Sequence, residues 1–145
     1  MKKHLFAIAA LAACGILVPT AAQAATPTVM ITKVYVNSPG SDTRSKKSLD
    51  AEYIVLKNTT KKTINLSGWT VRDRSKHIYK FTSLNLGAGK SVTLHTGSGT
   101  NTSANRYWGS HNYIWNNSGD KAYLRRTTAN IDTCTWKTVS SYVNC

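Results

Sequence analysis

Beyond residue 25, apolar and polar residues alternate in short runs, and residues that favour turns break each run. No stretch there keeps an apolar period of 3.6 residues over three helical turns. This alternation predicts about eight short strands at spacings of roughly 8–12 residues. We expect strands over 29–36, 52–56, 66–72, 78–81, 91–95, 113–115, 122–125 and 131–136. The pattern is typical of an all-β sandwich or barrel.

Length and charge narrow the function classes. The chain has 145 residues, which suits one domain and excludes large catalytic scaffolds such as a (β/α)₈ barrel of roughly 250 residues. Lys and Arg number 19 against 6 Asp and Glu, so the formal net charge is +13. Only 17% of the residues are charged, which argues against a disordered basic tail. The composition indicates a small folded module that favours anionic partners.

The N-terminus has the organisation of an export signal. A positively charged start at 2–4 precedes an apolar run over 5–18, and small residues flank position 23 ahead of an expected cleavage near Ala24. The apolar run is shorter than the roughly 20 residues that a membrane-spanning helix needs. We therefore expect a signal peptide over 1–24, no transmembrane segment, and a secreted, extracellular bacterial protein.

Cys14 offers an alternative to simple secretion. Residues 11–14 resemble a bacterial lipobox, whose cysteine is lipid-modified and becomes the new N-terminus. The apolar run continues past Cys14 to Val18, whereas a lipobox usually passes at once to a polar tether. A lipid anchor through Cys14 is the minor alternative.

Two cysteines, Cys134 and Cys145, remain after export. Because an exported chain meets an oxidising compartment, we expect these two to pair and to hold 137–145 as a C-terminal extension. Such a bridge typically contributes roughly 2–4 kcal/mol, and less in a short loop. Two unpaired thiols are the alternative.

Short motifs follow one another in a specific order along the exported part. They are ITKVYVNSPGSD at 31–42, EYIVLKN at 52–58, INLSGWTVRD at 64–73, LGAG at 86–89, WNNSGDKAYL at 115–124 and ID at 131–132. In this order and spacing the chain resembles the lamin tail domain family over 28–136, as a secreted bacterial stand-alone member. The resemblance implies an immunoglobulin-like β-sandwich and a binding role more than a reaction.

The nuclear role of lamins does not transfer with this resemblance. In nuclear lamins the domain is a docking surface for proteins and nucleic acid. This sequence has no heptad region, so it has no counterpart of the lamin rod. Cys134 in the final strand also departs from the family pattern.

Candidate catalytic motifs fail on their spacing. His77, His95 and His111 lie in no metal-binding pattern, although three histidines assembled through space remain an alternative. Ser98 lies between two glycines, but threonines occupy the outer positions where a nucleophile elbow requires glycine. We expect no catalytic residue, no metal and no cofactor.

The six carboxylates are Asp42, Asp50, Glu52, Asp73, Asp120 and Asp132. Three of them, Asp42, Asp120 and Asp132, lie in or next to turns, where side-chain bonds to the backbone explain them. The other three would have to converge at one end to hold a cation such as Ca²⁺. Pairing with Lys or Arg is the favoured interpretation.

Charge placement suggests a binding surface. If consecutive strands alternate in direction, loops 37–50, 73–77, 97–112 and 127–130 share one end of the sandwich. That end would gather the basic residues Arg44, Lys46, Lys47, Arg74, Lys76, Arg106 and Arg126, with the aromatic residues Tyr107 and Trp108 among them. Basic side chains beside aromatic ones suit polyanions and single-stranded nucleic acid. A set of solvated loops, with Trp108 in the core, is the alternative.

The sequence therefore predicts a non-enzymatic binding module for extracellular polyanions, such as an anionic wall polymer, DNA or an acidic protein surface. Binding to nucleic acid would be nonspecific, because no base-reading helix is present. A docking module for one specific partner protein is an alternative of a different class. A small metal-dependent hydrolase is the least favoured alternative.

Overall fold

A computed structural model describes residues 25–145. The signal peptide expected over 1–24, its cleavage site and the alternative lipid anchor at Cys14 lie outside the described residues. Within 25–145, no helix is long and apolar enough to cross a membrane.

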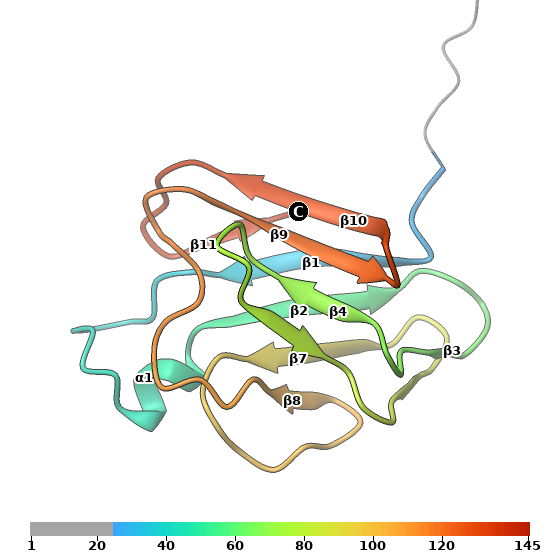
Figure 1. Cartoon of the computed structure of the whole chain (residues 1–145), viewed down its shortest axis with the longest axis horizontal. Helices are drawn as coiled ribbons and strands as arrows, with labels where there is room; N and C mark the ends of the chain where they lie inside the picture. Colours follow the sequence, from blue (N-terminus) through green and yellow to red (C-terminus); the bar gives the residue numbers. More distant parts are fainter. Residues whose placement is uncertain (1–24) are drawn as a thin grey trace, which may run out of the picture.

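Two antiparallel-rich sheets pack face to face as a β-sandwich, as expected (Figure 1). The five-stranded sheet has the order β11-β1-β2-β7-β8, with β1 Val29–Tyr35, β2 Tyr53–Asn58, β7 Ser91–His95, β8 Asn105–Tyr107 and β11 Tyr142–Asn144. The four-stranded sheet has the order β10-β9-β4-β5, with β4 Thr70–Arg72, β5 Ile78–Lys80, β9 Asp120–Arg126 and β10 Ala129–Trp136. Smaller elements are the pair β3 Ile64–Asn65 and β6 Asn85–Leu86, and the helix α1 Lys46–Asp50.

The period-two alternation builds the core. Apolar side chains on the inner faces of the two sheets form it, and Ile31 and Ile54 from the five-stranded sheet and Val71 and Leu124 from the four-stranded sheet are fully buried. Because successive residues of a strand point to opposite faces, the intervening polar residues reach the two outer surfaces of the sandwich. The outer faces therefore carry polar and charged side chains such as Lys33, Lys57 and Lys121.

The structure differs from the predicted strands around residues 96–119. The predicted strand at 113–115 is irregular, because the backbone amides of Ile114 and Trp115 donate to the Glu52 carboxylate instead of to a neighbouring strand. The short strand β8 lies inside the predicted loop and runs parallel to β7. A parallel neighbour requires a crossover, so simple alternation of strand direction fails from here onward.

The C-terminal residues close one edge of the sandwich. Strand β11 pairs with β1, and so the residues beyond 136 contribute an edge strand. Cys134 and Cys145 form a disulfide, which confirms the predicted pairing. Cys134 lies in β10 of one sheet and Cys145 directly follows β11 of the other, so the bridge joins the two sheets.

Candidate functional site

Five predicted binding residues do share one end of the sandwich. Arg44 precedes α1, Lys46 and Lys47 lie in α1, and Arg74 and Lys76 lie in the turn between β4 and β5. All five are exposed. The loops that carry them surround a common pocket, which places them at the same end.

The other predicted residues do not join this surface. Arg106 is buried, and its guanidinium donates to the Ser83 carbonyl at 2.7 Å. Trp108 packs against the core and lies edge-on to Trp115, with the ring centroids 6.0 Å apart. Arg106 and Trp108 therefore do not join the exposed residues at this end, and Trp108 packs against the core as in the alternative interpretation.

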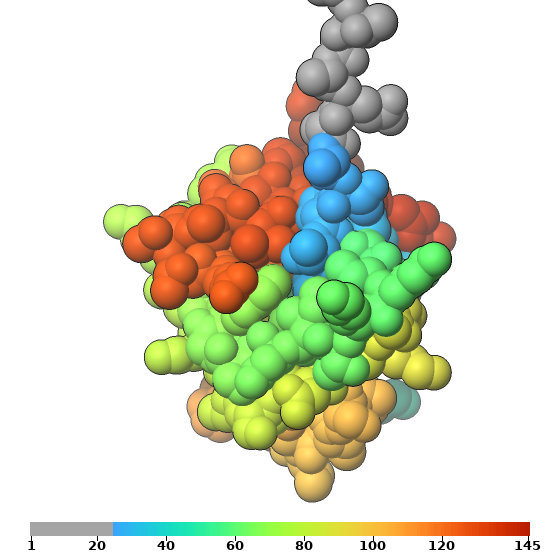
Figure 2. Space-filling model, turned by 90° about the vertical axis from the view of Figure 1, so that its right-hand side faces the viewer, coloured from blue at the N-terminus to red at the C-terminus, as the bar shows by residue number. Residues whose placement is uncertain are grey.

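Arg126 lies at the opposite end of the molecule. It ends β9 at the turn into β10, whereas β9 begins at Asp120, which binds the backbone amide of Arg74. Figure 2 shows this opposite end, with the turn in orange-red. The placement fails because 108–119 stays at one end instead of crossing the sandwich as a strand.

Tyr107 belongs to a row of aromatic side chains on the outer face of the five-stranded sheet. Each of the five strands contributes one ring, in the order Tyr142, Tyr35, Tyr53, His95 and Tyr107. Successive ring centroids lie 5.7, 5.3, 5.8 and 5.0 Å apart. Burial in the row, with Tyr35 alongside, raises the pKa of the Tyr53 phenol. Such cross-strand pairs stabilise a sheet.

The glycine-rich segment after β7 packs against this row. A Cβ at Gly99 would lie 2.5 Å from the ring of Tyr107, and a Cβ at Gly97 would collide with the Asp50 carboxylate. Glycine is required at both positions because the backbone approaches these side chains closely.

A second group of cations covers the outer face of the four-stranded sheet. Tyr123 of β9 lies at its centre, with the Arg72 guanidinium 5.0 Å and the Lys121 ammonium 5.1 Å from the ring centroid. Lys80 and Arg125 flank Thr70 in the strand register, so they share this face. We call these five residues the basic sheet face.

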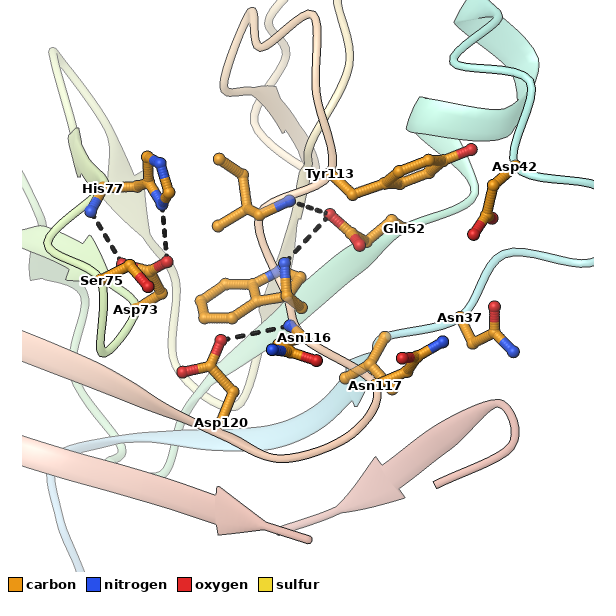
Figure 3. A pocket seen from close by; sticks show the side chains of 13 residues that line it. Asn37, Asp42, Glu52, Asp73, Ser75, His77, Tyr113, Asn116, Asn117 and Asp120 are labelled. Atoms are coloured by element: carbon orange, nitrogen blue, oxygen red, sulfur yellow. Dashed lines mark hydrogen bonds and ion pairs between the residues drawn. The ribbon is translucent and has the colours of Figure 1, made fainter. Parts of the chain in front are cut away.

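A pocket of about 340 Å³ opens at the end that carries α1 (Figure 3). Four of the six carboxylates line it: Asp42, Glu52, Asp73 and Asp120. No Lys or Arg is among the described residues that line it. We call this the acidic pocket.

Two of the four carboxylates hold turns in place. Asp73 accepts hydrogen bonds from the backbone amide and the Nδ1 of His77, at 2.7 and 2.6 Å. Asp120 accepts from the amides of Arg74, Asn116 and Lys121, at 3.2, 3.2 and 2.7 Å. Both oxygens of each carboxylate are engaged.

Glu52 is fully buried and differs from these two. Its Oε1 accepts from the Thr96 hydroxyl at 2.6 Å and from the amides of Ile114 and Trp115 at 2.7 and 3.4 Å. Its Oε2 is buried and has no hydrogen-bond partner among residues 25–145. Burial raises the pKa of this carboxyl to about 7, although the three hydrogen bonds oppose the shift.

Within residues 25–145, the favoured pairing of Asp50, Glu52 and Asp73 with Lys or Arg holds only for Asp50, and the alternative, their convergence at one end, occurs only in part. Glu52 and Asp73 line the same pocket, whereas Asp50 pairs with Lys46 along α1. In the described part of the chain, no group of three or more His, Cys, Asp or Glu side chains is placed to hold a metal ion. The pocket carboxylates are thus spread around the walls.

Sequence reasoning missed the basic sheet face. A signal was present, because Lys121, Tyr123 and Arg125 alternate with the buried Ala122 and Leu124. Only the strand register brings Arg72 and Lys80 beside them.

This architecture defines the class of protein: an immunoglobulin-like β-sandwich with charged outer surfaces. The family model of the Lamin Tail Domain matches residues 22–138. The chain belongs to the lamin tail domain family, which confirms the resemblance seen in the motifs and indicates a non-enzymatic binding module. No curated protein matches the chain.

Proposed function

We propose that the protein is a secreted module that binds extracellular polyanions through the basic sheet face. The observation that carries this proposal is that Arg72 and Lys121 lie against the Tyr123 ring, while Lys80 and Arg125 share the same outer face of the sheet. The carboxylates lie elsewhere: four line the acidic pocket, Asp50 lies on α1, and Asp132 binds the Ile31 amide. No acid therefore offsets the charge of this face.

The geometry suits a repeating anionic polymer. Neighbouring strands lie about 4.8 Å apart and alternate residues of one strand about 7 Å apart, so the cations are spaced like charges along a polymer. Among residues 25–145, the only helix is the short α1, which lies at the end of the sandwich, so the face offers no helix that could enter a groove and read bases. The expected binding is electrostatic and independent of sequence.

Binding of a fluorescent single-stranded oligonucleotide and of heparin tests the proposal. With four cations engaged at about 0.7 per phosphate contact, affinity for the oligonucleotide falls about 50-fold between 50 and 200 mM salt. The double variant Arg72→Glu/Lys121→Glu should lose most of this binding and about half of the salt dependence. Thermal unfolding checks that the variant is folded.

A matched control variant changes the net charge by the same amount, but at the end of the sandwich that carries α1. Lys47→Glu/Arg74→Glu reverses two exposed cations at the end that the sequence predicted for binding. We expect a smaller loss, from the reduced net charge alone. If the control loses as much affinity as the sheet-face variant, or if that variant binds normally, the basic sheet face is not the binding surface.

The aromatic row supports a second candidate, docking of a specific partner protein. Tyrosine is enriched at protein interfaces, and Tyr142 at the end of the row is 45% exposed. Binding through this surface would change little with salt. The affinity for any protein partner that the wild type captures is measured at increasing salt, for the wild type and for Tyr142→Ser. An affinity that changes little with salt but falls in Tyr142→Ser separates this candidate from polyanion binding.

A further inference from the structure

The second oxygen of the Glu52 carboxylate is unusual for a buried acceptor. Oε1 takes three hydrogen bonds, from the Thr96 hydroxyl and the amides of Ile114 and Trp115, whereas Oε2 takes none. Figure 3 shows Oε2 turned away from the two amides and into the acidic pocket. A buried polar atom without a partner is rare in native proteins, and this one borders a pocket with room for a group that supplies the donor.

The surroundings of Oε2 favour a cation. Asp42, Asp73 and Asp120 add negative charge to the walls, and no basic side chain among the described residues lines the pocket to neutralise it. The aromatic residues Tyr113 and Trp115 also line it. Carboxylates combined with aromatic rings are suited to ammonium groups, which donate hydrogen bonds and are attracted to ring faces.

The same geometry argues for an organic cation over a metal ion. Calcium takes six to eight oxygen ligands at 2.3–2.6 Å. Within residues 25–145, the carboxylates do not form such a group. The volume of about 340 Å³ is at the small end of ligand pockets and suits an alkyl chain with a charged head.

We propose that the acidic pocket binds a primary alkylammonium group, which donates to Glu52 Oε2 and is surrounded by Asp42, Tyr113 and Trp115. The group comes either from a free amine or from a lysine side chain of a basic peptide. This site is separate from the basic sheet face, and its failure would leave polyanion binding untouched.

Proton linkage makes ligand affinity at this site depend on pH. An ammonium group pairs with the ionised carboxylate, and burial holds much of Glu52 in its neutral form near pH 7. Binding should therefore strengthen as pH rises from 6 to 8. Asp42, Asp73, Asp120, His77 and Tyr113 also face the pocket, so His77→Gln serves as the control for histidine titration.

Isothermal titration calorimetry of the purified protein at pH 6 and pH 8 tests the proposal with n-butylamine and with N-acetyl-lysine methylamide. The acetylated norleucine analogue is the neutral control ligand. We expect binding of one or both amines, stronger at pH 8, and no binding of the norleucine analogue. The ligand that binds more tightly, n-butylamine or N-acetyl-lysine methylamide, identifies a free amine or a lysine side chain as the source.

Glu52→Gln is the decisive variant, because glutamine keeps a carbonyl that can accept the three Oε1 hydrogen bonds but places an amide at Oε2. It should weaken amine binding at least tenfold and remove the pH dependence. Asp50→Asn is the matched control, since Asp50 carries a carboxylate on α1 without lining the pocket, and it should bind normally.

Two results would overturn the site. One is normal amine binding by Glu52→Gln, and the other is no amine binding by the wild type at millimolar ligand. Calcium chloride is titrated in parallel, and binding of calcium in place of amines would also refute the organic-cation proposal. If Glu52→Gln fails to fold, Asp42→Asn replaces it, with the expected result a clear loss of affinity.

Discussion

Replacing Glu52 with glutamine should change how the stability of the protein depends on pH. The carboxyl is fully buried, and its pKa is raised from 4.5 to about 7, mainly because burial penalises the charged form. In the unfolded chain the same group returns to its ordinary value. The folded protein therefore holds a proton on Glu52 over a pH range in which the unfolded chain has lost it.

The sign and size follow from proton linkage. A carboxyl whose pKa is raised by folding stabilises the folded state fully below pH 4.5, and this contribution is lost as pH rises through about 7. A pKa shift of this size, at 1.36 kcal/mol per pKa unit, corresponds to about 3 kcal/mol of folding stability. Such a loss is a large fraction of the stability of a small domain.

Urea unfolding between pH 4.5 and 8.5 measures this effect, with the fluorescence of the buried Trp69, Trp115 and Trp136 as the signal. The free energy of unfolding of the wild type, taken relative to Glu52→Gln, should fall by about 3 kcal/mol across that range. The subtraction removes the titration of the other groups. A relative change below about 1 kcal/mol would show that Glu52 is solvated or paired when folded, contrary to the reasoning.

Three further substitutions test the packing. Cys145→Ser opens a bridge between residues separated by 11 positions and should cost about 3 kcal/mol in urea unfolding under non-reducing conditions. Gly99→Ala should cost about 1–3 kcal/mol by driving a methyl group into the Tyr107 ring, whereas Ser98→Ala next to it should be neutral. Asn58→Ala removes a fully buried amide that donates to three backbone carbonyls, and we expect about 2–3 kcal/mol, measured by thermal unfolding. An unchanged midpoint in any of the three cases would contradict the corresponding contact.

The fold was predictable because its signals are local. Alternation of apolar residues identified most strands, and the motifs identified the family. The segment 113–115 shows the limit of such signals. Its residues are typical of a strand, but its amides bind Glu52, which lies about sixty positions earlier in the chain.

The candidate sites were less predictable, because they depend on which strands become neighbours. Lys121, Tyr123 and Arg125 are visibly alternate in the sequence, but their partners on β4 and β5 follow from the register. In the sequence, Glu52 resembles an ordinary residue at the end of a strand. No neighbouring residue indicates that its carboxyl is buried, with one oxygen unpaired among residues 25–145.

The aromatic row also gives the five-stranded sheet a spectroscopic signal. Four phenol rings and one imidazole, with neighbouring centroids 5.0 to 5.8 Å apart, form a chiral array of coupled chromophores, with one member from every strand. A slip of one residue in any strand would turn its ring to the other face and interrupt the array. Near-ultraviolet circular dichroism of the tyrosines therefore reports the alignment of the whole sheet, including the parallel β8 at one edge and the C-terminal β11 at the other.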